Sequence, residues 1–297
     1  MEAKGTGNRW ELSAPESYIL LHGPKGGPEG AEEAFKLALM ELAARGWIAT
    51  DKGQRSVGEE TSGAQADSLL ARGETDFAPK QRPLVAALAV FEGALSEAGN
   101  PREGIPAAEV RRFAETRYSK LSAFAEEEVL PSLQERGHYE YAEDKMLGLI
   151  PREGYKETEA GGRARRELEL TTEQAQTNFP EWARRDPDRA LSFLGTAGPA
   201  MLLMPSLYPQ AAGITGSGGA GADAEEMAGF GEGSLEPSAF EGLSGLSGGL
   251  DAAFSEDLAG GLFASSFLEG MFGDPGGAGY GGGDFGGGDG GGGGGGP

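Results

Sequence analysis

Apolar residues recur at helical spacing along most of the first 200 residues, and this pattern predicts a body built from helices. Two stripes are the clearest: Phe35, Ala38, Leu39 and Leu42 in residues 31–45, and Leu84, Leu88, Phe91 and Leu95 in residues 83–95. The same spacing predicts a helix after Pro106, helices over 162–168 and 174–185, and one over 121–136 with a kink at Pro131.

One pattern occurs twice: an apolar helix end, then Arg-Gly, then an extended stretch. Its first copy is LAARGW (42–47) and its second is LQERGH (133–138). Gly46 stands where a left-handed cap ends a helix, and a short strand over 47–52 is expected to follow. Because the pattern recurs at two helix-to-strand junctions, it predicts a duplicated module.

The second copy leads into a predicted β-hairpin. The stretch after His138 is followed by a turn, by YKETEAG (155–161) and by a helix. Two strands so close in the chain need a hairpin, Thr158 can cap the following helix, and Gly161 eases the corner. This order of helix, Arg-Gly, strand, turn, strand and helix resembles the wing of bacterial winged-helix proteins, which implies that local fold.

A longer resemblance covers most of the chain. The order SAPESYILLHGP, AFKLALMELAARGWI, a second wing-bearing unit, an apolar helical segment and a glycine- and phenylalanine-rich end is similar to the cytosolic parts of uncharacterised bacterial predicted membrane proteins with glycine-rich tails. The helix and its junction also resemble bacterial relatives of the Golgi phosphoprotein 3 family, whose members bind phosphoinositide headgroups. Neither resemblance carries a chemical motif that transfers residue by residue, so both bear on fold more than on function.

We therefore expect a mainly α fold with small β wings, in which tandem winged-helix-like units precede a disordered, acidic, Gly-rich tail. The expected parts are a first winged-helix-like unit (10–52), a linker (53–79), a second winged-helix-like unit (80–170), a helical packing segment (171–210) and the tail (211–297).

The charge balance narrows the range of partners. The formal net charge is -22, and no Lys or Arg follows Arg189. Nucleic acids and anionic lipids bind proteins through Lys and Arg, so a chain this acidic repels both. We expect the partner to be another protein or a second copy of this chain, which makes a homo-oligomer possible.

Composition also favours a cytoplasmic location. The chain has no cysteine, which excludes disulfides and thiolate metal sites, and residues 1–17 lack the apolar core of a secretory signal. One uncharged stretch, 190–208, is long enough to span a bilayer. Pro199 and Pro205 favour a buried helix-turn segment there instead.

Two clusters of basic residues raise the possibility of a nucleic-acid or anion contact surface. They are Arg111, Arg112, Arg117 and Lys120 in the first cluster, and Arg163, Arg165 and Arg166 in the second. Glutamates alternate with the first cluster, at Glu109, Glu115 and Glu126 to Glu128, so we interpret it as a solvated face. One uninterrupted cationic surface formed by Arg111, Arg117, Arg163 and Arg166 would overturn that interpretation.

Residues that could perform chemistry are few. His22 and His138 fall in different units, and neither has a metal-type spacing to a second ligand. The turn GPKGGPEG (23–30) precedes a helix but matches no phosphate-binding motif, and its two prolines remove N–H donors. We therefore predict no catalytic, metal or cofactor-binding residue.

The tail carries an apolar pattern of its own. Its candidate docking motif is Leu250, Phe254, Leu258, Leu262, Phe263 and Phe267, the first four of which stand four residues apart. Glycines at 260 and 261 weaken an isolated helix there. We expect this segment to become ordered only against a partner or against its own body.

These observations predict a non-catalytic protein-protein interaction or scaffolding protein with a flexible acidic tail. Two alternatives stay open: a DNA-binding transcriptional regulator, which the winged-helix pattern suggests, and a peripheral membrane protein that binds anionic headgroups.

Overall fold

Helix α2 (Gly27–Ala44) is the element around which the others pack. From Ala34 to Leu42 its side chains are nearly all buried, on every face of the helix. A helix that is buried all round must be enclosed by other elements, and helices from both ends of the described chain, together with a strand, contact it. The stripe of Phe35, Ala38, Leu39 and Leu42 is thus confirmed as core.

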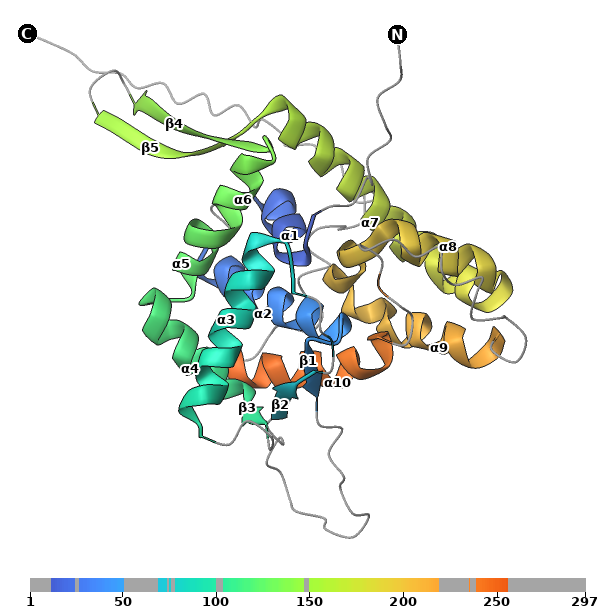
Figure 1. The fold of residues 1–297 in the computed structure, drawn as a ribbon. Helices are drawn as coiled ribbons and strands as arrows, with labels where there is room; N and C mark the ends of the chain where they lie inside the picture. Colours follow the sequence, from blue (N-terminus) through green and yellow to red (C-terminus); the bar gives the residue numbers. More distant parts are fainter. Residues whose placement is uncertain are drawn as a thin grey trace, which may run out of the picture. The chain divides into compact units, whose positions relative to one another are not determined.

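The structure is a computed structural model that describes residues 12–24, 27–50, 69–73, 75, 78–99, 104–146, 150–218, 235 and 239–255. All of them belong to one unit, residues 1–257, and a second unit, 258–297, lies outside the described residues. The described part is mainly helical with two small antiparallel sheets, as the sequence predicts (Figure 1).

The remaining helices are α1 (Ala14–His22), α3 (Arg82–Glu97), α4 (Ala107–Tyr118), α5 (Ser122–Phe124), α6 (Leu130–Glu135), α7 (Glu159–Arg185), α8 (Pro187–Ala197), α9 (Tyr208–Gly218) and α10 (Ala239–Ser255). A π-helical turn, η1 (Ala125–Val129), and two 3-10 segments, η2 (Gly198–Leu203) and η3 (Pro205–Leu207), join some of them. The strands are β1 (Ile48–Thr50), β2 (Leu69–Arg72), β3 (Ile105–Pro106), β4 (Tyr139–Met146) and β5 (Ile150–Glu157).

The first sheet has the order β1-β2-β3 and joins the two predicted units. Strand β1 pairs antiparallel with β2, with Ala49 opposite Ala71, and β2 pairs with β3, with Leu70 opposite Ile105. The predicted linker over 53–79 is therefore wrong at β2, and the sheet crosses the predicted boundary between the units. The physical reason is that a lone strand after α2 leaves its backbone unpaired, and β2 and β3 complete the ladder.

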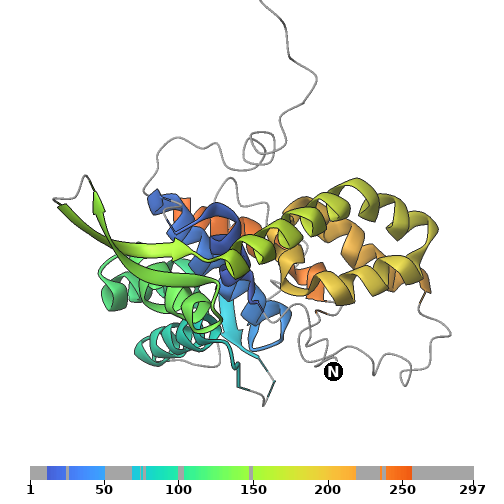
Figure 2. The same ribbon diagram turned by 90° about the horizontal axis from the view of Figure 1, so that it is seen from above.

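The second sheet is the predicted hairpin of β4 and β5, in which Ala142 lies opposite Gly154. The hairpin extends away from the helices (Figure 2). Thr158 caps α7 as predicted: its Oγ1 accepts a hydrogen bond from the Gly161 N–H at 3.0 Å. A side chain at Gly161 would lie 2.2 Å from the carbonyl oxygen of His138, so the corner requires glycine.

The two Arg-Gly junctions have the same backbone hydrogen bonds. In the first, Trp47 N–H donates to Leu42 O at 2.9 Å, and in the second His138 N–H donates to Leu133 O at 2.8 Å. The glycine before each donor, Gly46 or Gly137, is left-handed with a φ of 75°. These bonds confirm the sequence repeat as a structural repeat at both helix ends.

Each junction also receives the strand that returns from its hairpin. Gly73 N–H donates to Trp47 O at 2.9 Å, and Thr158 N–H donates to His138 O at 3.0 Å. The repeat therefore covers a helix end, a left-handed glycine and an antiparallel hairpin in both places.

The predicted kink at Pro131 takes the form of the π-helical turn η1, which immediately precedes α6. Proline has no N–H to donate to the carbonyl four residues back. That carbonyl, Glu127 O, accepts instead from Arg82 Nη2 at 2.8 Å, and Arg82 Nε also bonds Glu128 Oε2 at 3.0 Å. Arg82 thus ties α3 to the proline-induced bulge.

Helix α7 is longer than predicted, because it joins the predicted helices over 162–168 and 174–185 and passes through Pro180. The uncharged stretch 190–208 contains most of α8, both 3-10 segments and the first residue of α9. Within the described ranges, no helix combines the length and apolar character needed to cross a membrane.

The predicted disorder of residues 211–297 is wrong for two described segments. Residues 211–218 belong to α9, and residues 239–255 form α10. Both helices pack on the body, and burial of their apolar side chains offsets the entropy that their glycines add to the unfolded chain.

Candidate helix-binding site

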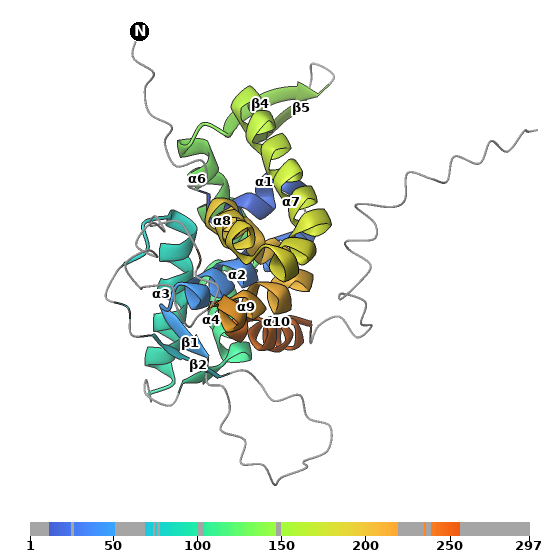
Figure 3. The ribbon, with the colours of Figure 1, turned by 90° about the vertical axis from the view of Figure 1, so that its right-hand side faces the viewer.

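Helix α10 lies against α2, α4 and α9 (Figure 3). We call the surface that these three helices offer to it the α10 groove. The buried apolar side chains of α10 recur every three or four residues, at Phe240, Leu243, Leu246 and Leu250 and then at the adjacent pair Ala253 and Phe254. This spacing makes one continuous apolar face, which is the pattern of a helix held in a groove.

Aromatic contacts hold both ends of α10. The ring of Phe254 lies 6.1 Å from the ring of Phe35 in α2, and the ring of Phe240 lies 5.7 Å from that of Tyr208 in α9. Tyr208 is fixed in turn by its hydroxyl, which donates to Leu202 O at 2.6 Å. The register of α10 in the groove is therefore set at two separate points.

An ion pair joins α10 to α2 at the rim of the groove. Lys36 Nζ lies 2.6 Å from Asp251 Oδ1 and 2.5 Å from Glu33 Oε2. The Lys36 side chain is only 13% exposed. Burial by itself lowers the pKa of Lys36, but the two carboxylates outweigh it and raise that pKa above its ordinary value. Burial also raises the pKa of Glu33, which Lys36 partly offsets.

Arg111 of α4 holds the C-terminal end of α10. Its Nη1 donates to Ala253 O at 3.1 Å, its Nε donates to Glu115 Oε1 at 2.9 Å, and its guanidinium lies 5.8 Å from the centre of the Phe254 ring. A C-terminal helix carbonyl is a favourable partner for a cation. Arg111 is 8% exposed, so it belongs neither to the predicted solvated face nor to the possible basic contact surface.

The other predicted basic residues lie on the surface of two separate helices. In α4, Arg112 pairs with Glu109, and Arg117 lies against the Tyr118 ring. Lys120, just after α4, is exposed. Helix α4 packs on α3 and α10, whereas α7 packs on α1, α8 and α9, and Figures 1 and 3 show the two apart.

The second cluster lies in the first turns of α7. Arg163 pairs with Glu159 at 2.5 Å, Arg165 lies 3.4 Å from Glu157, and Arg166 is exposed. The four arginines whose convergence would have overturned the sequence interpretation thus do not form one cationic surface, because Arg111 is buried and the others divide between α4 and α7.

The predicted docking motif of the tail is placed only in part. Leu250 and Phe254 are buried in the α10 groove, so this part of the segment is ordered against its own body. The other four members, Leu258, Leu262, Phe263 and Phe267, lie outside the described residues. The apolar spacing in the sequence identified Leu250 and Phe254. The predicted motif did not include Phe240 and Leu243, which belong to the same buried face.

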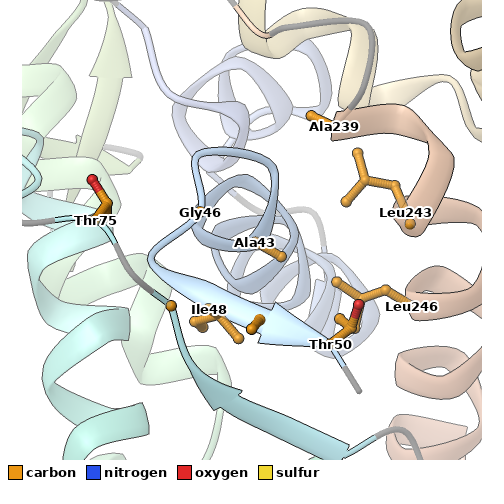
Figure 4. A pocket seen from close by; sticks show the side chains of 11 residues that line it. Ala43, Gly46, Ile48, Thr50, Thr75, Ala239, Leu243 and Leu246 are labelled. Carbon is orange, nitrogen blue, oxygen red and sulfur yellow. The ribbon is translucent and has the colours of Figure 1, made fainter. Parts of the chain in front are cut away.

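A cavity of about 520 Å³ adjoins the N-terminal half of α10 (Figure 4). It lies between α10, the end of α2 and strand β1, and the described residues that line it are apolar apart from two threonines. These lining residues are Ala43, Gly46, Ile48, Ala49, Thr50, Gly73, Thr75, Ala239, Gly242, Leu243 and Leu246. The hydroxyls of Thr50 and Thr75 are the polar side-chain groups among these described residues.

Two fully buried carboxylates, which the sequence analysis missed, fasten α1 to the two Arg-Gly junctions. Glu16 Oε2 accepts from Ser13 N–H at 2.7 Å, and its Oε1 accepts from Ser132 Oγ at 2.7 Å and from Arg136 Nε at 3.0 Å. Ser13 and Glu16 stand in the S-x-x-E spacing of a capping box, a signal that was available in the sequence.

Glu41 is the second buried carboxylate. Its Oε2 accepts from Ala14 N–H at 2.6 Å, and its Oε1 accepts from Arg45 Nη2 at 2.7 Å and from Arg45 Nε at 2.9 Å. Burial raises the pKa of Glu41, and Arg45 partly offsets the shift. Since every carboxylate oxygen of this pair has a partner, the network stabilises the junctions.

The two histidines belong to different elements. His22 is in the last turn of α1, with its ring 4.5 Å from that of Tyr18, and His138 follows Gly137 at the second junction. Burial lowers the pKa of both imidazoles, and Arg136 lowers that of His138 further.

Among the side chains that the structure describes, no three His, Asp or Glu residues lie close enough together to hold a metal ion. No protein-family model matches the chain, and no curated protein is significantly similar to it in sequence. The resemblances to winged-helix proteins and to the Golgi phosphoprotein 3 family stay predictions.

Proposed function

We propose that this chain is a non-catalytic protein-binding or scaffolding protein, built on two winged-helix-like units, that binds partners through helix contacts. The observation that carries the proposal is the α10 groove: the body already holds an amphipathic helix by a buried apolar face, an ion pair from Lys36 and a carbonyl contact from Arg111. Helix-in-groove packing is a recurring mode of peptide recognition.

The structural repeat supports the winged-helix-like units. Each copy has a helix that ends at a left-handed glycine and an antiparallel hairpin whose returning strand bonds the residue after that glycine. In this interpretation β1 and β2 form the first wing, and β4 and β5 form the second.

The distribution of charge favours a protein partner over a phosphate-bearing one. Binding to DNA or to anionic headgroups needs several cations on one surface. Arg111 is committed to Ala253 O and Glu115, and Arg163 is paired with Glu159.

The proposal is tested by offering α10 in trans. A fluorescent peptide of residues 239–255 is titrated with the full chain carrying Leu250→Ala and Phe254→Ala, which weaken the internal α10, and with the wild-type chain as the matched control. We expect binding to the double variant and much weaker binding to the wild type, whose tethered α10 competes at a high effective concentration. No binding to a double variant that retains its circular dichroism would overturn the proposal.

The competing functions are tested with the wild-type chain. We expect no shift of a labelled DNA duplex at low salt, and no flotation with vesicles that contain anionic lipids. DNA binding that weakens steeply with salt would favour a transcriptional regulator. Flotation with anionic vesicles would favour a peripheral membrane protein instead.

A further inference from the structure

We propose that the α10 groove is specific for an acidic amphipathic helix, that α10 is its internal occupant, and that a partner protein presenting such a helix displaces α10. This inference rests on the proposed function and adds to it the chemistry of the partner and the way in which access is regulated. Its recognition pattern is Leu-Asp-x-x-Phe, as Leu250, Asp251 and Phe254 present it.

The pattern follows from three contacts on one face of α10. Leu250 and Phe254 stand four residues apart and are both buried, while Asp251 stands three residues before Phe254 and meets Lys36 at the rim. Arg111 lies over the Phe254 ring and bonds Ala253 O. A competing helix must therefore supply two apolar residues, one of them aromatic, and a carboxylate at the position of Asp251.

Charge complementarity favours an acidic partner helix over a basic one. Among the described side chains, the cations that contact α10 are Lys36 and Arg111, and α10 itself contains no Lys or Arg. A lysine at the half-exposed position of Asp251 would face the mostly buried ammonium group of Lys36, and like charges at that distance repel.

Both cations keep a partner when α10 leaves. Lys36 retains Glu33 at 2.5 Å in its own helix, and Arg111 retains Glu115 at 2.9 Å in its own helix. Breaking a buried ion pair is costly mainly because it leaves an unpaired charge. Since neither cation is left unpaired, the electrostatic cost of releasing α10 is low, which is what a displaceable occupant requires.

The composition of α10 also favours its displacement by a partner helix. Four of its 17 residues are glycines, at 242, 245, 248 and 249. Each glycine lowers the equilibrium constant for helix formation roughly fivefold relative to alanine. The groove does not require these glycines at two positions, because a Cβ at Gly245 or Gly248 would meet no atom within 4 Å. A partner helix without them therefore competes well against the tethered α10.

The closing experiment is a charge-reversal cycle on the double variant described above. The peptide 239–255 is compared with its Asp251→Lys form, each against the Leu250→Ala/Phe254→Ala chain with and without Lys36→Glu. We expect Asp251→Lys to weaken binding roughly tenfold or more and Lys36→Glu to restore the binding of that peptide. Equal binding of both peptides would overturn the inference and leave the proposed function standing, whereas no binding of either peptide would overturn both.

Displacement is tested on the wild-type chain, which needs no destabilising substitution. A peptide with Gly245→Ala and Gly248→Ala should bind roughly tenfold or more tightly than the natural peptide and should speed hydrogen exchange of the α10 amides in the intact protein. The Asp251→Lys version of this peptide is the matched control and should do neither. Unchanged exchange at a saturating concentration of the first peptide would overturn displacement. If two copies of the wild-type chain exchanged their α10 helices, the protein would be a dimer in solution. This result would overturn the proposal that the displacing helix belongs to a separate partner protein.

Discussion

Gly46 and Gly137 have the same left-handed backbone conformation, with a φ of 75°, and each stands two residues after a helix ends and two residues before a strand begins. In each case the next residue donates its N–H back to the helix, to Leu42 O or Leu133 O. The relationship shows that the Arg-Gly repeat encodes one corner used twice.

Alanine at either glycine should therefore destabilise the protein by a similar amount. A Cβ at Gly46 or Gly137 meets no atom within 4 Å, so the cost is that of the left-handed conformation alone, about 1–2 kcal/mol. Urea unfolding of Gly46→Ala and Gly137→Ala checks this. Gly154→Ala is the control, because that glycine has open space and no left-handed backbone; a loss as large in the control would contradict the explanation.

The second glycine of each corner should tolerate alanine less well. A Cβ would lie 1.8 Å from Gly46 O at Gly73 and 2.2 Å from His138 O at Gly161. Because a backbone carbonyl cannot move aside alone, we expect Gly73→Ala and Gly161→Ala to cost about 3 kcal/mol or more. Thermal unfolding measures the loss. Values no larger than those for Gly46→Ala would show that the corners relax easily.

Removing the buried carboxylate of Glu41 should be among the most damaging single changes. Glu41→Ala removes the buried carboxylate that accepts from Arg45 and from the Ala14 N–H, and we expect a loss of about 3–5 kcal/mol in the free energy of unfolding. Glu41→Gln should cost less, because the amide oxygen can still accept one of these bonds. Glu173→Ala, at an exposed position of α7, is the control and should stay within about 0.5 kcal/mol of the wild type.

The pH dependence of stability should report on the same carboxylate. The pKa of Glu41 is higher in the folded state than its ordinary value of 4.5, so the folded state holds a proton that the unfolded state has released. The stability contributed by this protonation is present below pH 4.5 and is lost as pH rises through the raised pKa. The stability of the wild type relative to Glu41→Gln should therefore fall across that window, and an increase would contradict the assignment.

Both histidines should titrate below the ordinary pKa of 6.5. Burial lowers the pKa of His22 and His138, so the unfolded state binds protons that the folded state does not. Their contribution to stability is present above pH 6.5 and is lost as pH falls through the lowered pKa values. NMR titration of the two imidazoles checks this, with His22→Gln to assign the signals. A midpoint above 6.5 for either ring would be inconsistent with the packing described.

At alkaline pH, stability should depend on the ionisation of two buried tyrosines. Burial raises the pKa of Tyr118 and of Tyr139 to about 12, and the neighbouring carboxylates Glu128 and Glu157 add to the shifts. The stability that these two raised pKa values contribute is therefore present below pH 10. It is lost between about pH 10 and 12, where the two tyrosines ionise only in the unfolded state. A phenolate absorbance titration should show these two tyrosines ionising late, and normal titration of all seven tyrosines in a folded sample would contradict it.

Local patterns in the sequence predicted much of the secondary structure. The stripe at Phe35 and Leu42 identified the central helix, the Thr158 cap and Gly161 located the start of α7, and Pro131 located a break in helical geometry. Each of these signals acts within a few residues, through side-chain periodicity, a cap or a missing N–H, so each can be read from neighbouring positions.

The candidate site was only partly predictable, because long-range pairing decides it. Leu250 and Phe254 were visible as an apolar pattern, but nothing near Asp251 or Lys36 in the sequence indicates that the two meet. Arg111 was predicted to be a surface cation for the same reason: its exposure depends on whether α10 covers it.

By itself the sequence determined the helical character of the body, the duplicated Arg-Gly corner and the excess of acidic residues. Only the tertiary structure decided that β3 completes the sheet of β1 and β2, that Glu16 receives Arg136, and that α10 folds onto α2 and α4. The physical reason is one of range: caps and periodicity stabilise a segment from within, whereas strand partners, buried ion pairs and groove occupants gain their stability from residues far away in the chain.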